Sequence, residues 1–137
     1  MTLVLSGPIR DAIREHARSG APEEVVGVLA GDRRGTKASV SRAYRTKNTA
    51  DRPRTRYEID PGEEIELLER IDAAGLECVG FYHSHPEGPT APSETDARLA
   101  AWPGYSYVIV SLRSGTADFG SWRWDGDRFE REEVRAE

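Results

Sequence analysis

The chain has 137 residues, of which 37% are hydrophobic and 31% charged, and its formal net charge at pH 7 is −5. This length and composition predict a single domain, residues 1–137, with its own core. The acidic balance argues against nucleic acid as a partner, because phosphate binding needs a basic footprint. The lone cysteine, Cys78, excludes an internal disulfide and the cysteine-rich zinc motifs. Without an apolar stretch of ~20 residues or a signal peptide, we expect a cytoplasmic protein with no membrane contact.

The first segment of the chain favours a strand followed by a helix. Residues 2–5 are apolar enough for a short strand. Ser6 is a suitable capping residue, and Pro8 suits the first turn of a helix. Gly20 and Pro22 predict where that helix ends.

The next segment predicts a pair of strands and then a loop. Residues 25–30 form an apolar run too short for a helix, which indicates a buried strand. A polar turn over residues 32–35 leads to a partner strand over residues 37–45. Residues 46–56 are polar and irregular and indicate a loop with three arginines. This loop flanks a plausible substrate groove, so its arginines are candidates for contact with a partner.

The rest of the chain continues the alternation of helices and strands. Residues 60–63, Asp-Pro-Gly-Glu, predict the capped start of a second helix that ends at Gly75. The remaining expected elements are a buried strand over 76–82, a short helix over 93–101, a strand over 105–112, and strands over 117–124 and 128–134 joined by Asp125-Gly126. The whole predicts an α/β domain of about six strands and three helices.

Two histidines stand at the end of the strand predicted for residues 76–82. His83 and His85 are two residues apart, so strand alternation places both imidazoles on one face. The loop that follows can turn the chain back so that Asp96 reaches the same ion. Two histidines and one aspartate suit zinc, with Zn–N bonds of ~2.0–2.1 Å, and leave the fourth position open. An open position is typical of a catalytic zinc site.

Such a site also benefits from a carboxylate that takes a proton from water and later delivers it to a leaving amine. Two adjacent acids, Glu23 and Glu24, precede the apolar strand at 25–30. If this strand neighbours the strand at 76–82, one of the two acids can overhang the metal. Spacing alone does not choose between them.

The combined pattern resembles the JAMM (MPN-plus) metallopeptidases, in particular small prokaryotic members such as the archaeal desampylases. The pattern comprises Glu24-x-x-Gly27, residues 83–86 with the sequence His-Ser-His-Pro, and then Ser93 and Asp96. The resemblance implies a three-layer α/β/α fold with a central mixed sheet, of the cytidine-deaminase-like type. In that family the Glu-x-x-Gly spacing favours Glu24 over Glu23.

The resemblance also implies a reaction and a set of roles. It implies one catalytic Zn²⁺ ion and hydrolysis of the isopeptide or peptide bond after the C-terminal Gly-Gly of ubiquitin-like modifier proteins. By motif position, His83, His85 and Asp96 become the metal ligands and Glu24 the general base. Ser93 becomes the residue that donates a hydrogen bond to the oxyanion.

Other functions remain open at this point. The same chemistry can process the C-terminus of a ubiquitin-like sulfur-carrier precursor. Domains of this fold without the metal-binding residues serve as non-catalytic MPN scaffolds. A relative associated with DNA repair has a similar motif, but the acidic charge argues against it. A zinc deaminase would need cysteine ligands that this chain lacks.

Some of these residues also have plain structural interpretations. Ser93 and Asp96 match a capping box, which would itself hold Asp96 rigid. His16 is expected to be exposed on the first helix. Cys78 is expected on the strand face opposite His83 and His85, as a buried small side chain and not a nucleophile.

Overall fold

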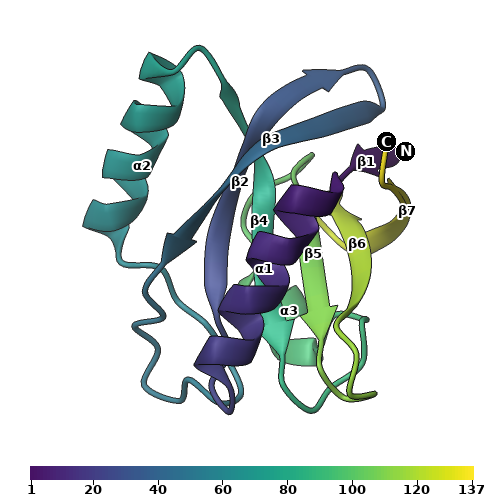
Figure 1. The fold of residues 1–137 in the computed structure, drawn as a ribbon. Helices are drawn as coiled ribbons and strands as arrows, with labels where there is room; N and C mark the ends of the chain where they lie inside the picture. Colours follow the sequence, from purple (N-terminus) through teal and green to yellow (C-terminus); the bar gives the residue numbers. More distant parts are fainter.

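The computed structural model describes all 137 residues, which form seven strands and three helices (Figure 1). The elements in chain order are β1 (Thr2–Val4), α1 (Gly7–Gly20), β2 (Val26–Arg34), β3 (Lys37–Thr46), α2 (Pro61–Ala73), β4 (Glu77–His85), α3 (Glu94–Leu99), β5 (Ser106–Ser111), β6 (Asp118–Trp124) and β7 (Phe129–Arg135). Each lies where the sequence predicts it, within a few residues. None of the helices combines the length and apolar character needed to cross a membrane.

The strands form one mixed sheet in the order β1-β3-β2-β4-β5-β6-β7. The pair β4 and β5 is parallel, as are the pairs that β1 makes with β3 and β7, and the other neighbours are antiparallel. Because β1 pairs with both ends of the order, the sheet curls and closes, and the two termini lie close together (Figure 1). The predicted α/β class with a central mixed sheet is confirmed.

Helix α1 covers one face of the sheet. Its residues Ile13 and Ala17 are fully buried in a cluster that also holds Tyr82. Ser6 occupies the N-cap position as expected, but its side chain makes no capping hydrogen bond. The prediction of an exposed His16 is wrong: the side chain is half-buried, and its Nδ1 lies 2.7 Å from the Tyr82 hydroxyl. The buried hydroxyl needs a polar partner, and the neighbouring helix supplies one.

Helix α2 packs on the other face, as Figure 1 shows. Its buried residues Leu67 and Ile71 belong to a second core cluster, which contains Phe81 of β4. The predicted cap is present, since the Asp60 carboxylate accepts a hydrogen bond of 3.1 Å from the Glu63 N–H. The two helices thus hold the sheet between them and leave the carboxyl end of β4 to form the site.

One irregularity changes the face on which Cys78 lies. The register between β2 and β4 shifts so that Val79 is an extra residue of β4. Cys78 therefore packs in the same cluster as Phe81. Because side chains alternate along a strand, His83 lies on the same face of β4 as Phe81. The prediction that Cys78 lies on the opposite face is wrong because of this bulge. Burial raises the pKa of its thiol to about 11, which is typical of a structural cysteine.

Candidate metal centre

The two motif histidines lie side by side at the carboxyl end of β4. The strand continues beyond its predicted end at residue 82 as far as His85, because β5 pairs with it there. Both imidazoles project from one face, and their Nε2 atoms are 3.2 Å apart. His83 is 1% exposed and His85 6%, so both rings are shielded from bulk water.

Asp96 reaches the same point from the first turn of α3. Its Oδ2 atom lies 3.1 Å from Nε2 of His83 and 2.9 Å from Nε2 of His85. A capping box fixes this carboxylate: the Ser93 N–H donates to Oδ2 at 2.9 Å, and the Asp96 N–H donates to Ser93 Oγ at 3.0 Å. Although burial alone would raise it, the contacts with the two imidazoles hold the pKa of Asp96 far below its usual range.

The second nitrogen of His85 shows which ring nitrogen is free for a ligand. Its Nδ1 lies 2.7 Å from the Pro89 carbonyl oxygen. A carbonyl can only accept, so Nδ1 carries a proton, and in the neutral imidazole Nε2 then presents a lone pair. Two side chains anchor the loop that supplies this carbonyl: Ser111 Oγ donates to the Gly88 carbonyl at 2.5 Å, and Trp122 Nε1 donates to the Thr90 carbonyl at 2.8 Å.

This donor set fits a metal ion. Burial lowers the pKa of His83, which keeps that imidazole neutral. Although burial alone would lower it, the contacts with Asp96 and Pro89 raise the pKa of His85. A cation placed among the two ring nitrogens and the carboxylate oxygen would be stabilised by all three. In a tetrahedron with bonds of ~2.0–2.1 Å, ligand atoms are about 3.3 Å apart. The observed separations of 2.9–3.2 Å are close to that spacing.

Glu24 completes the cluster. One ligand atom from each of Glu24, His83, His85 and Asp96 lies within 4.8 Å of the others, a grouping that could hold a metal ion. Glu24 is buried, with 6% of its surface exposed, whereas Glu23 is exposed, so Glu24 is the acid that lies beside the histidines. Burial, with the Asp96 charge as a second cause, raises the pKa of Glu24 to about 8. Its Oε1 atom is buried and has no hydrogen-bond partner.

The backbone around Glu24 explains the Glu-x-x-Gly spacing. Ser84 points away from the histidines, and its Oγ accepts a hydrogen bond of 2.8 Å from the Val25 N–H. Three residues after Glu24, a Cβ added to Gly27 would lie 2.1 Å from the Tyr82 ring. A side chain at this position would clash with the Tyr82 ring and with the backbone carbonyl oxygen of Tyr44, so the local structure would have to shift.

Sequence reasoning missed two residues of this site. Tyr57 stacks on His83, with ring centroids 4.5 Å apart and an interplanar angle of 29°. Asn48 donates from Nδ2 to the Glu24 carbonyl oxygen at 2.9 Å. Both lie in the segment between β3 and α2, residues 47–60, which we call the connecting loop. Its irregular sequence gives no periodic signal for either contact.

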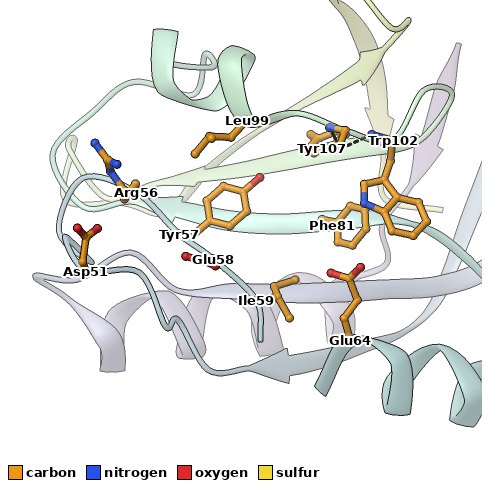
Figure 2. Close-up of a pocket in the computed structure, with 11 residues that line it drawn as sticks. Asp51, Arg56, Tyr57, Glu58, Ile59, Glu64, Phe81, Leu99, Trp102 and Tyr107 are labelled. Atoms are coloured by element: carbon orange, nitrogen blue, oxygen red, sulfur yellow. Dashed lines mark hydrogen bonds between the residues drawn. The ribbon is translucent and has the colours of Figure 1, made fainter. Parts of the chain in front are cut away.

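Two cavities flank the cluster. One of about 820 Å³ is lined by Glu24, His85 and Ser93 together with Arg54 of the connecting loop. The other, of about 410 Å³, is mostly apolar and lies on the far side of Tyr57. Figure 2 shows the Tyr57 ring between Arg56 and Phe81 in its lining. The four-residue cluster therefore borders the polar cleft directly, and Tyr57 connects it to the apolar groove.

Known proteins share this sequence pattern and fold. The family of prokaryotic homologues of the JAB domain matches residues 6–125. A desampylase of Haloferax volcanii is 45% identical over 98% of this chain and 96% of its own length. A CysO-cysteine peptidase of Mycobacterium tuberculosis is 34% identical over 81% of this chain and 74% of its own. A solution structure of a Desulfitobacterium hafniense protein superposes with a TM-score of 0.89 at 30% identity, covering 100% of this chain and 93% of that one.

The family match spans most of the chain, and the matched residues include the whole metal cluster. The predicted resemblance to the JAMM metallopeptidases is therefore confirmed, and the chain belongs to the prokaryotic JAB family.

Proposed function

We propose that the protein is a zinc metallopeptidase that hydrolyses the isopeptide or peptide bond after the C-terminal Gly-Gly of ubiquitin-like modifier proteins. The observation that carries this proposal is the buried convergence of Glu24 with His83, His85 and Asp96. The names of the relatives, a desampylase and a CysO-cysteine peptidase, support the same chemistry on modifier proteins. The lack of a membrane-spanning helix is compatible with the cytoplasmic location that we also propose.

The two histidines and Asp96 are proposed as the ligands of one Zn²⁺ ion. When bound, zinc acts as a Lewis acid that polarises a carbonyl and increases the acidity of water. The choice of zinc rests on the mixed nitrogen and oxygen donors, which suit this ion in four-coordinate sites.

Glu24 is proposed as the general base and acid. Its unpaired Oε1 lies beside the cluster and can accept the proton of the attacking water. The same carboxylic acid then protonates the leaving amine as the C–N bond breaks. Without metal its pKa is about 8, and a bound cation nearby would lower this pKa toward the working pH, where a group both takes and returns a proton.

Ser93 is proposed to stabilise the oxyanion. Its Oγ uses a lone pair to accept the Asp96 N–H, so its own O–H remains available to donate. The side chain lines the polar cleft together with Glu24 and His85. The capping role and the catalytic role therefore use different parts of one hydroxyl.

The connecting loop provides a place for an extended modifier tail. No backbone hydrogen bond of the protein uses the N–H or C=O groups of Tyr57 and Ile59, while Glu58 between them bonds to Asn48 and Thr49. A tail can therefore pair with this short edge as an added strand. The apolar groove of about 410 Å³ beside it can receive a side chain that precedes the two glycines.

A second candidate is the C-terminal processing of a ubiquitin-like sulfur-carrier precursor. The mycobacterial relative named as a CysO-cysteine peptidase favours it, because that name describes a bond to a cysteine. The non-catalytic scaffold is disfavoured, since all four residues of the cluster are present and buried.

The test is a gel assay with purified zinc-loaded protein and a ubiquitin-like modifier joined to a lysine side chain. The proposal predicts release of the modifier, with no release after chelation or in the Glu24→Gln variant. A linear fusion with the same tail distinguishes the two candidates. Failure to release the modifier from either substrate, in protein with bound zinc, would contradict the proposed function.

A further inference from the structure

The Asn48 side chain uses all of its hydrogen-bonding capacity. Its Nδ2 donates to the carbonyl oxygens of Glu24 at 2.9 Å and of Arg56 at 3.0 Å. Its Oδ1 accepts from the N–H groups of Ala50 at 3.0 Å and Glu58 at 3.1 Å. Two donors and two acceptor sites are the whole inventory of an amide side chain. One residue thus joins the start of β2 to both halves of the connecting loop.

The backbone of Glu24 is held by the connecting loop alone. Its C=O accepts from Asn48, and its N–H donates to the Pro53 carbonyl oxygen at 2.7 Å. Glu24 precedes β2, so no ladder hydrogen bond of the sheet fixes it. The position of its carboxylate relative to the histidines therefore depends on the loop together with Val25, which Ser84 ties to β4.

The same hydrogen bonds fix Tyr57. Asn48 bonds to Arg56 before it and to Glu58 after it. This holds the ring of Tyr57 against His83, at a centroid distance of 4.5 Å. The backbone groups of Tyr57 make no backbone hydrogen bond within the protein, and Tyr57 lines the apolar groove.

We propose that Asn48 is a positioning residue, which sets the place of the Glu24 carboxylate and ties it to the edge that receives the substrate tail. This inference rests on the proposed function, in which Glu24 transfers the proton. Asn48 touches neither the substrate bond nor the metal ligands' donor atoms and acts through Glu24. Displacement of a catalytic group by about 1 Å can reduce turnover about 100-fold, so a modest shift of this carboxylate matters.

The test compares Asn48→Asp with Thr49→Val. Aspartate has the shape of asparagine and keeps the acceptor for Ala50 and Glu58, but it turns a carboxylate oxygen toward the carbonyls of Glu24 and Arg56. Thr49→Val removes one hydrogen bond of the same loop, from Thr49 Oγ1 to the Glu58 carbonyl at 3.1 Å, and leaves Glu24 untouched. Comparison of the two variants therefore distinguishes the effect of a loosened loop from the effect of a displaced Glu24 carboxylate.

Two readouts are measured on each protein, with one metal ion bound per chain confirmed first. In the steady-state assay, Asn48→Asp is expected to lower kcat about 10- to 100-fold with a smaller change in KM, and Thr49→Val to leave kcat within about twofold. In protein loaded with Co²⁺, the visible absorption bands report the coordination geometry. Asn48→Asp is expected to shift these bands in the direction that Glu24→Gln does, and Thr49→Val is not.

Each other outcome is decisive. Wild-type kcat together with wild-type Co²⁺ bands in Asn48→Asp would overturn the proposal. A rise in KM alone would also overturn it, because Asn48 would then shape only the tail edge. If the wild-type protein cleaves no modifier substrate, the proposed function fails, and the Co²⁺ bands alone decide whether Asn48 positions Glu24.

Discussion

Replacing Glu24 with glutamine is expected to stabilise the metal-free protein while it removes activity. Glu24 is 6% exposed, and burial next to Asp96 raises its pKa from 4.5 to about 8. When the folded state has the higher pKa, it keeps a proton that the unfolded chain releases, so stability falls as pH rises between the two values. With these pKa values, folding at pH 7 requires Glu24 to take up a proton, which lowers stability by about 3 kcal/mol relative to low pH. Glutamine has the same shape and carries no charge.

The measurement is urea unfolding of both proteins in the presence of a chelator, from about pH 5 to about pH 8. The wild-type free energy of unfolding should fall relative to that of Glu24→Gln as pH rises, by about 3 kcal/mol at pH 7. The difference between the two proteins removes the contribution of titrating groups that do not interact with Glu24. Zinc-loaded Glu24→Gln should keep its metal and lose about 10²- to 10⁴-fold in kcat. Parallel pH curves for the two metal-free proteins would refute the reasoning about this carboxylate.

Three further changes have expected outcomes. Ser93→Ala should lower kcat about 10²- to 10³-fold in zinc-loaded protein, and Ser93→Thr should restore most of it; an unchanged kcat in Ser93→Ala would remove the oxyanion role. Glu132→Ala should reduce the free energy of unfolding, measured by urea titration, by about 3–5 kcal/mol. The reason is the loss of the buried carboxylate that pairs with Arg123 at 2.6 Å. A loss below about 1 kcal/mol would show that this ion pair contributes little to stability. Reversing the charges of Arg52 and Arg54 should lower kcat/KM about tenfold at low ionic strength if these exposed arginines attract an acidic modifier, and salt should shrink the difference. A loss that does not respond to salt would speak against electrostatic attraction.

The sequence predicted the elements of the fold because their signals are local. Hydrophobic runs and turn residues mark each strand and helix, and the Asp60 cap forms as expected. The sequence-based predictions were wrong where a contact between distant segments, or an irregular strand pairing, overrode a local pattern. The extra residue Val79 places Cys78 on the face opposite to the predicted one. The buried Tyr82 hydroxyl forms a hydrogen bond with His16, which was predicted to be exposed.

The histidines, Asp96 and Ser93 could be found because their spacing reflects short-range geometry, namely strand alternation and a capping box. The choice between Glu23 and Glu24 needed either the family pattern or the structure, because it depends on how β2 lies against β4. Asn48 and Tyr57 could not be found. Their contacts join an irregular loop to residues more than twenty positions away, and no periodicity marks them.

The central claim is hydrolysis of the bond that follows the C-terminal glycine of a modifier. The most direct measurement is cleavage of a modifier–lysine conjugate by the zinc-loaded protein in water enriched in ¹⁸O, followed by mass spectrometry of the released modifier. Our account predicts one heavy oxygen in the C-terminal glycine carboxylate, an unmodified lysine on the other product, and no reaction with Glu24→Gln. Cleavage at another bond, release without the heavy oxygen, or equal release by Glu24→Gln would contradict it.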